Sequence, residues 1–148
     1  MADYLKEPLA DPALDALTAL QPAKIDTFKP VNVELTTTGT STIWTPASGK
    51  KFVVYGWDIH ILTTVTLAAA AGGVALCLYD ASVSDANIIG TLEALRSDAS
   101  AGQMFHSQLD RRFGHTSATA DQALIVGPAI DITTGKVRIS GTVWGTEV

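Results

Sequence analysis

The sequence predicts an all-β protein, an antiparallel β-sandwich that is jelly-roll-like, preceded by an extended Pro-rich N-terminal arm carrying a short helix. Residues 51–62 alternate with period two, which is typical of a long strand covering a core. Short apolar runs then recur along the chain, separated by turns rich in Gly, Pro, Ser and Thr. Four of the six prolines lie within the first thirty residues, whereas all twelve glycines follow them. We therefore expect an arm over residues 1–30 and one sandwich domain over residues 31–148.

The arm contains one plausible helix. Asp11 can cap it, Pro12 suits its first position, and Pro22 ends it after residues 13–20. A helix of about two turns is unstable alone in water, so it must dock on its own domain, a sister subunit or another protein. A disordered leader is the alternative. Five leucines argue against it and are the expected partner contacts: Leu5, Leu9, Leu14, Leu17 and Leu20.

The first strands follow the arm. Residues 31–36 alternate apolar and polar side chains, as a half-exposed strand does, and residues 42–45 form a second short strand before a turn at residues 46–49. The long strand 51–62 comes next. Strict alternation places one set on its apolar face: Val53, Tyr55, Trp57, Ile59 and Ile61. The other face then carries Phe52, Val54, Gly56, Asp58, His60 and Leu62.

The middle of the chain continues in the same way. Residues 63–70 are expected to form a hairpin with residues 74–79 through Gly72-Gly73. Residues 74–79 are apolar on both faces, which indicates a strand buried on both sides. Residues 88–95 suit a strand, but their final part equally suits the start of a helical turn.

The last third of the chain predicts further strands, at residues 103–109, 123–126, 129–132 and 137–144. Residues 111–121 are expected to form an exposed loop, and residues 133–136 a turn. The total is about eight to ten strands, in keeping with a sandwich or jelly roll.

Composition excludes several functions. A chain of 148 residues suits one domain, and only 17% are charged, so we expect partners to cover part of the surface. The net charge is −5 and the basic residues are scattered, which argues against nucleic acid. The longest apolar run is too short and too rich in Ala and Gly for a membrane span, and no secretory signal is recognisable, so synthesis in the cytoplasm is expected. Cys77, the one cysteine, is expected to be a buried apolar residue.

Candidate chemistry is sparse. Asp58 and His60 share a face of one strand and so can pair or share a metal. No third ligand is identifiable, so a polar pair at a subunit contact is the expected role. The residue types of a hydrolase occur together in Ser107, Asp110 and two histidines, His106 and His115, without the spacing of a nucleophile elbow. We therefore expect no enzyme activity, no catalytic residue, no cofactor and no bound metal. Exposed Trp44 and Trp144 at strand ends would suit sugar stacking, which keeps carbohydrate binding as an alternative.

Two segments resemble small virion structural proteins of tailed phages. One is Trp44–Phe52, which leads into a strand with Gly56, and the other is the C-terminal Ile139–Glu147. The resemblance covers residues 42–62 and 136–147. It implies a non-enzymatic structural protein of the virion, such as a capsid decoration (cement) protein, a head-fibre base or a tail component.

Taken with the leucine-bearing arm, it predicts a homo-oligomer, with a trimer as the first expectation. The arm would attach the oligomer to the major capsid protein or another virion protein, with no role for nucleic acid or membrane. The alternative is a carbohydrate-binding or host-attachment module of a phage tail or head fibre.

Overall fold

The computed structural model describes residues 25–36, 39–69, 73–96, 99–130 and 132–148. This part contains eight strands and one short 3₁₀ helix, Asp85–Asn87. The strands are β1 Thr27–Thr36, β2 Ser41–Trp44, β3 Phe52–Ala69, β4 Gly73–Asp80, β5 Ile88–Arg96, β6 Met104–Thr116, β7 Leu124–Pro128 and β8 Ile132–Glu147. The described residues contain no helix with the length and hydrophobicity of a membrane span.

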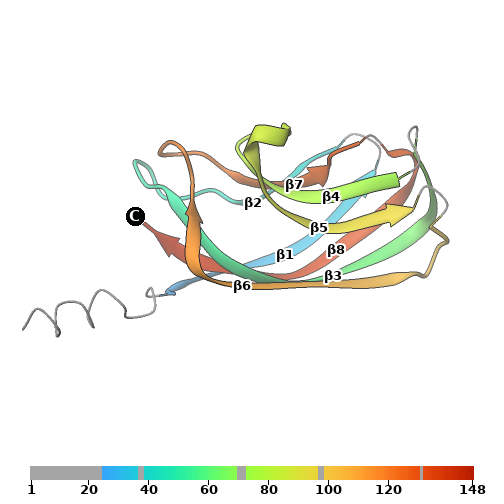
Figure 1. The fold of residues 1–148 in the computed structure, drawn as a ribbon, viewed down its shortest axis with the longest axis horizontal. Helices are drawn as coiled ribbons and strands as arrows, with labels where there is room; N and C mark the ends of the chain where they lie inside the picture. The colour runs from blue at the N-terminus through green and yellow to red at the C-terminus, as the bar shows by residue number, and fades with distance from the viewer. Residues whose placement is uncertain (1–24, 37–38, 70–72, 97–98, 131) are drawn as a thin grey trace, which may run out of the picture.

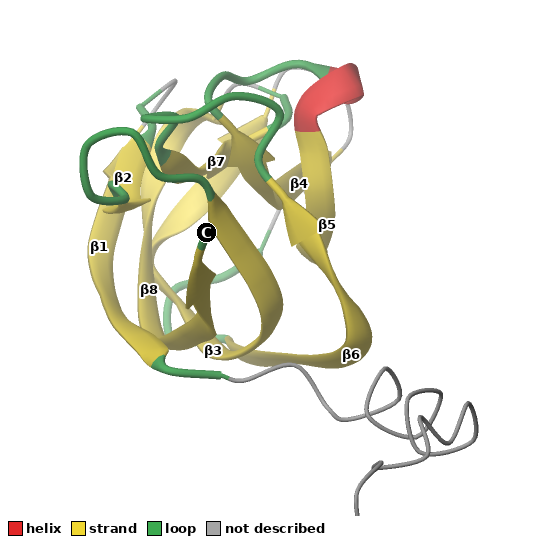
Figure 2. Ribbon diagram, turned by 90° about the vertical axis from the view of Figure 1, so that its left-hand side faces the viewer, coloured by secondary structure: helices red, strands yellow, loops and turns green. Residues whose placement is uncertain are grey.

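The strands form two four-stranded antiparallel sheets, which confirms the predicted β-sandwich. One sheet has the order β1-β8-β3-β6 and the other β2-β7-β4-β5. Figure 1 shows them as two layers, and Figure 2 shows how they curve over one another. The chain changes sheet at every connection except the one from β4 to β5. Residues far apart in sequence therefore supply most of the pairing.

Strands β3 and β8 form the centre of the first sheet. They pair from Phe52 opposite Glu147 to Ala69 opposite Ile132. β3 also pairs with β6 on its other side, and β1 pairs with β8, so that β1 and β6 are the edge strands. The long alternating segment found in the sequence is thus a central strand, as predicted.

The core lies between the inner faces of the two sheets. Large side chains from both sheets are fully buried there, including Phe52, Ile59 and Ile139 from one sheet and Leu76, Leu78 and Leu124 from the other. Burying such a side chain contributes about 1.5–3 kcal/mol relative to leaving it in water. β4 is buried on both faces, as its sequence predicts, because Cys77 and Tyr79 pack with Ile125 on the sheet's opposite side. Cys77 is 1% exposed, which confirms its burial.

The two faces of β3 differ from the strict alternation expected. Tyr55 has no partner in the ladder between Val54 and Gly56, so the strand carries a β-bulge there. The extra residue shifts the alternation by one, because side chains alternate with period two. Phe52 and Val54 therefore join Trp57, Ile59 and Ile61 in the core. The predicted faces are correct from Trp57 onward and wrong before the bulge.

The expected hairpin between residues 63–70 and 74–79 is also wrong. β3 pairs with β6 and β8, whereas β4 pairs with β5 and β7 in the opposite sheet. Both strands have an apolar inner face, and these faces are buried against one another across the core rather than side by side in one sheet.

Two segments expected to be irregular are strands. Residues 111–116, expected in a loop, complete β6. Their polar side chains suit β6, because it is an edge strand. One of them, Arg111, donates a hydrogen bond at 3.2 Å to the carbonyl of Ile89, which lies on β5 of the other sheet. Residues 133–136, expected to be a turn, belong to β8. Gly135 serves a close approach there, because a Cβ would lie 2.7 Å from the Thr66 carbonyl oxygen.

Only residues 25–30 of the expected arm are described. Thr27–Pro30 already pair with β8, so β1 begins before the predicted Val31. Pro30 is tolerated because β1 is an edge strand, where a missing N–H need not break a ladder. The predicted helix and the five leucines, Leu5, Leu9, Leu14, Leu17 and Leu20, lie outside the described residues.

Candidate functional site

The candidate site lies on the outer face of the β1-β8-β3-β6 sheet. Asp58 and His60 are two residues apart on β3, beyond the bulge, and Ile59 between them is fully buried. Their side chains therefore point outward, on the face opposite the core. His106 on β6 is the direct cross-strand partner of His60. Side chains in such pairs have Cβ atoms about 4.5–5.5 Å apart, so the pairing brings all three residues together.

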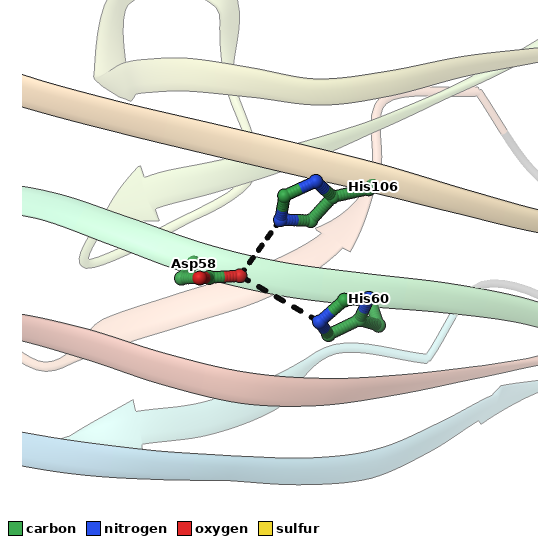
Figure 3. A group of neighbouring side chains, drawn as sticks. All are labelled: Asp58, His60 and His106. Atoms are coloured by element: carbon green, nitrogen blue, oxygen red, sulfur yellow. Dashed lines mark hydrogen bonds and ion pairs between the residues drawn. The ribbon is translucent and has the colours of Figure 1, made fainter.

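The three side chains form one compact group, the Asp58–His60–His106 cluster (Figure 3). His106 Nε2 donates a hydrogen bond to Asp58 Oδ1 at 2.8 Å, and His60 Nε2 lies 3.7 Å from the same oxygen. The two imidazole rings are stacked, with centroids 4.6 Å apart and planes inclined by 13°. Both rings thus present a nitrogen to one carboxylate.

The cluster is accessible to solvent. The side chains of Asp58, His60 and His106 are 46%, 59% and 47% exposed. Their direct cross-strand partners are uncharged: Gln108 is opposite Asp58 on β6, while Thr142 and Ser140 on β8 are opposite Asp58 and His60. Water and dissolved ions can therefore reach the three side chains.

The sequence identified two members of the cluster but not the third. Asp58 and His60 are two residues apart on a strand, and this spacing alone places their side chains on the same face. The position of His106 depends on the pairing of β3 with β6, which is a tertiary property. The expectation that no third ligand is identifiable is therefore corrected by the β3–β6 register.

The residues of the supposed hydrolase set are separated. Ser107 accepts a hydrogen bond from Trp57 Nε1 at 3.0 Å, on the inner side of the sheet, whereas His106 points outward. His115 lies 3.4 Å from Asp80 instead, and Asp80 also accepts the Ala118 N–H at 2.8 Å. This second pair connects β6 to β4 of the other sheet. Ser107, His106 and His115 do not form a catalytic arrangement.

The tryptophans differ from the expectation for sugar binding. Trp44 is 1% exposed, so the prediction that it is accessible is wrong. It packs against Phe52, with ring centroids 5.8 Å apart, and its Nε1 donates to Glu147 Oε1 at 2.8 Å. Trp144 is half-buried and lies over Gly56, where a Cβ would come within 2.7 Å of the indole ring.

Glu147 connects the ends of the two sheets. One carboxylate oxygen accepts from Trp44 and the other accepts the Ala47 N–H at 3.0 Å. These two hydrogen bonds, first that from Ala47 and then that from Trp44, hold the pKa of Glu147 below its ordinary value. By contrast, burial raises the pKa of Tyr79, which packs with Cys77 and Ile125.

No family model matches the chain, and no curated protein matches it. A chain in a solved structure, the cyanophage Pam1 capsid asymmetric unit, is similar over 97% of this chain and 96% of that chain. The identity is 17% and the TM-score is 0.40, a level of likeness from which neither a function nor a partner is assigned.

Proposed function

We propose that this chain is a non-enzymatic structural protein of a tailed-phage particle, most specifically a capsid decoration protein. In this proposal it is made in the host cytoplasm, assembles as a homotrimer, and attaches to the major capsid protein or another virion protein through residues 1–30.

The strand order supports a jelly-roll architecture for the domain. One sheet has the strand order β1-β8-β3-β6 and the other has the order β2-β7-β4-β5, and the chain passes back and forth between the two sheets. Two interleaved Greek keys produce such an order, and virus capsid proteins are among the proteins that use it. Lectins and cupins use it too, so the fold alone does not select a function.

The proposal depends on the positions of the two segments that resemble virion proteins. Residues 42–62 and 136–147 are remote in sequence, yet β3 and β8 pair directly, from Phe52 opposite Glu147 to Leu62 opposite Arg138. The hydrogen bond from Trp44 to Glu147 joins the start of the first segment to the end of the second. The resemblance to virion proteins thus concerns one continuous structural unit rather than two scattered matches.

Exposed apolar side chains give the domain material for contacts with other subunits. Phe28 on edge strand β1 is 64% exposed, and Met104 on edge strand β6 is 73% exposed. Large apolar side chains exposed to this degree are unfavourable in water and favour association. Their places on the two edges of one sheet suit a protein that contacts more than one neighbour.

Deletion of residues 2–24 tests the attachment. The two sheets lie entirely within residues 25–148, so the shortened chain should fold, as circular dichroism can verify. We expect full-length protein to co-sediment with phage particles and the shortened protein to remain in the supernatant. Equal co-sedimentation of both proteins would contradict attachment through the arm. Light scattering coupled to size-exclusion chromatography tests the trimer, and a monomer at every concentration would contradict it.

The carbohydrate-binding alternative has less support. It required both Trp44 and Trp144 to be accessible, and Trp44 is buried. Only Trp144 is partly available for stacking on a sugar ring. Glycan binding that disappears in Trp144→Ala would favour this alternative over the structural role.

A further inference from the structure

From the geometry of the Asp58–His60–His106 cluster we infer a binding site for a single divalent transition-metal ion of the Zn²⁺ type, with the two Nε2 atoms and one carboxylate oxygen as ligands. This site is independent of the proposed role in a virion, because it rests only on the three side chains and the two strands that hold them.

The donor set fits this class of ion. Imidazole nitrogen suits Zn²⁺, Ni²⁺, Cu²⁺ and Co²⁺, whereas Mg²⁺ and Ca²⁺ prefer oxygen ligands. Two imidazoles and one carboxylate are a frequent protein ligand set for zinc when a further position is left open. The partial exposure of the three side chains leaves room for water at that open position.

The distances fit as well. Ligands about 2.0–2.2 Å from a tetrahedral Zn²⁺ lie about 3.3 Å from one another. Asp58 Oδ1 is 2.8 Å from His106 Nε2 and 3.7 Å from His60 Nε2, values on either side of that separation. One ligand atom from each residue lies within 4.8 Å of the other two. Small side-chain rotations therefore suffice to bind an ion, without movement of the strands.

The backbone fixes these positions before an ion arrives. β3 is a central strand, paired on both sides at His60, with His106 on one side and Ser140 on the other. Two ligands come from this strand and the third from its direct cross-strand neighbour. Binding consequently orders only exposed side chains, which reduces its entropic cost.

Zinc titration of the tag-free, full-length protein by isothermal calorimetry tests the site. We expect one Zn²⁺ per chain, and a loss of more than about tenfold in affinity for each of Asp58→Asn, His60→Gln and His106→Gln, since even changes around a ligand cost about 10–100-fold. His115→Gln is the matched control, because it removes the remaining histidine, which pairs with Asp80 away from the cluster. This control should bind like the wild type.

A second measurement separates binding at the cluster from folding effects. Nitrogen NMR of the imidazoles should show that Zn²⁺ shifts the signals of His60 and His106 and leaves those of His115 unchanged. Added Zn²⁺ should raise the thermal unfolding midpoint, Tm, of the wild type and of His115→Gln, but not that of His106→Gln. Binding weaker than about 1 mM in the wild type, or equal binding by His106→Gln, would overturn the inference.

Discussion

Glu147 offers the sharpest test of how the two sheets are held together at one end. Its carboxylate accepts hydrogen bonds from Trp44 at 2.8 Å and from the Ala47 N–H at 3.0 Å. Glu147→Gln keeps the size of the side chain but replaces one of the two accepting oxygens by an amide NH₂ group. That group cannot accept a hydrogen bond, so either Trp44 Nε1 or the Ala47 N–H loses its acceptor. We therefore expect a loss of stability without a change of fold.

The magnitude follows from the two bonds and their exposure. Hydrogen bonds to a charged group contribute about 1.5–3 kcal/mol when shielded from water. Glu147 is half-exposed and one bond can re-form to the amide oxygen, so solvent screening and the remaining bond reduce the cost. We expect a loss of about 1–2 kcal/mol in the free energy of unfolding at neutral pH, and a fall in Tm of several degrees.

The loss should depend on pH. The folded protein lowers the pKa of Glu147, so its stabilising contribution is present above the unfolded pKa of about 4.3 and is lost as pH falls through the folded pKa. The difference between wild type and Glu147→Gln should consequently be complete at neutral pH and shrink in acid.

Denaturant unfolding followed by tryptophan fluorescence, repeated at several pH values, is the assay. Glu34→Gln is the control, because Glu34 is a more exposed carboxylate that pairs with Lys136 at 3.3 Å on the sheet surface. It should cost less than about 1 kcal/mol. A stability difference for Glu147→Gln that is absent at neutral pH, or constant into acid, would refute this account of the interaction.

Two further predictions concern the core. Gly56→Ala should destabilise the fold by about 1–3 kcal/mol or more, because its Cβ would overlap the Leu109 carbonyl oxygen and lie 2.7 Å from the Trp144 ring. A stability equal to wild type in chemical unfolding would contradict the described packing. Cys77, at 1% exposure, should react with a thiol reagent only under unfolding conditions, and rapid labelling of the native protein in mass spectrometry would contradict its burial.

Local patterns predicted most of the architecture. The alternation of residues 57–62 places Ile59 and Ile61 in the core and Asp58 and His60 outside, as observed. A β-bulge leaves no clear trace in such a pattern, which is why the alternation places Phe52 and Val54 on the wrong face. Tyr55 could equally belong to either face by its chemistry.

Pairing between strands is where sequence reasoning failed. Gly72-Gly73 suits a hairpin, yet β3 and β4 lie in opposite sheets, because the choice depends on the burial of both apolar faces at once. For the same reason, the sequence alone does not predict that His106 lies beside His60, which is forty-six residues earlier in the chain. A candidate site made by cross-strand neighbours becomes visible only when the register is known.

Electron microscopy of phage particles carrying this chain, labelled through its C-terminus, tests the central proposal most directly. Val148 is 55% exposed, so a short C-terminal tag can be reached by a gold-conjugated antibody without disturbing the sheets. A structural virion protein predicts many labels on each particle, and a decoration protein predicts that they cover the head. Particles that carry no label, from cells that contain the tagged protein, would contradict a role in the virion.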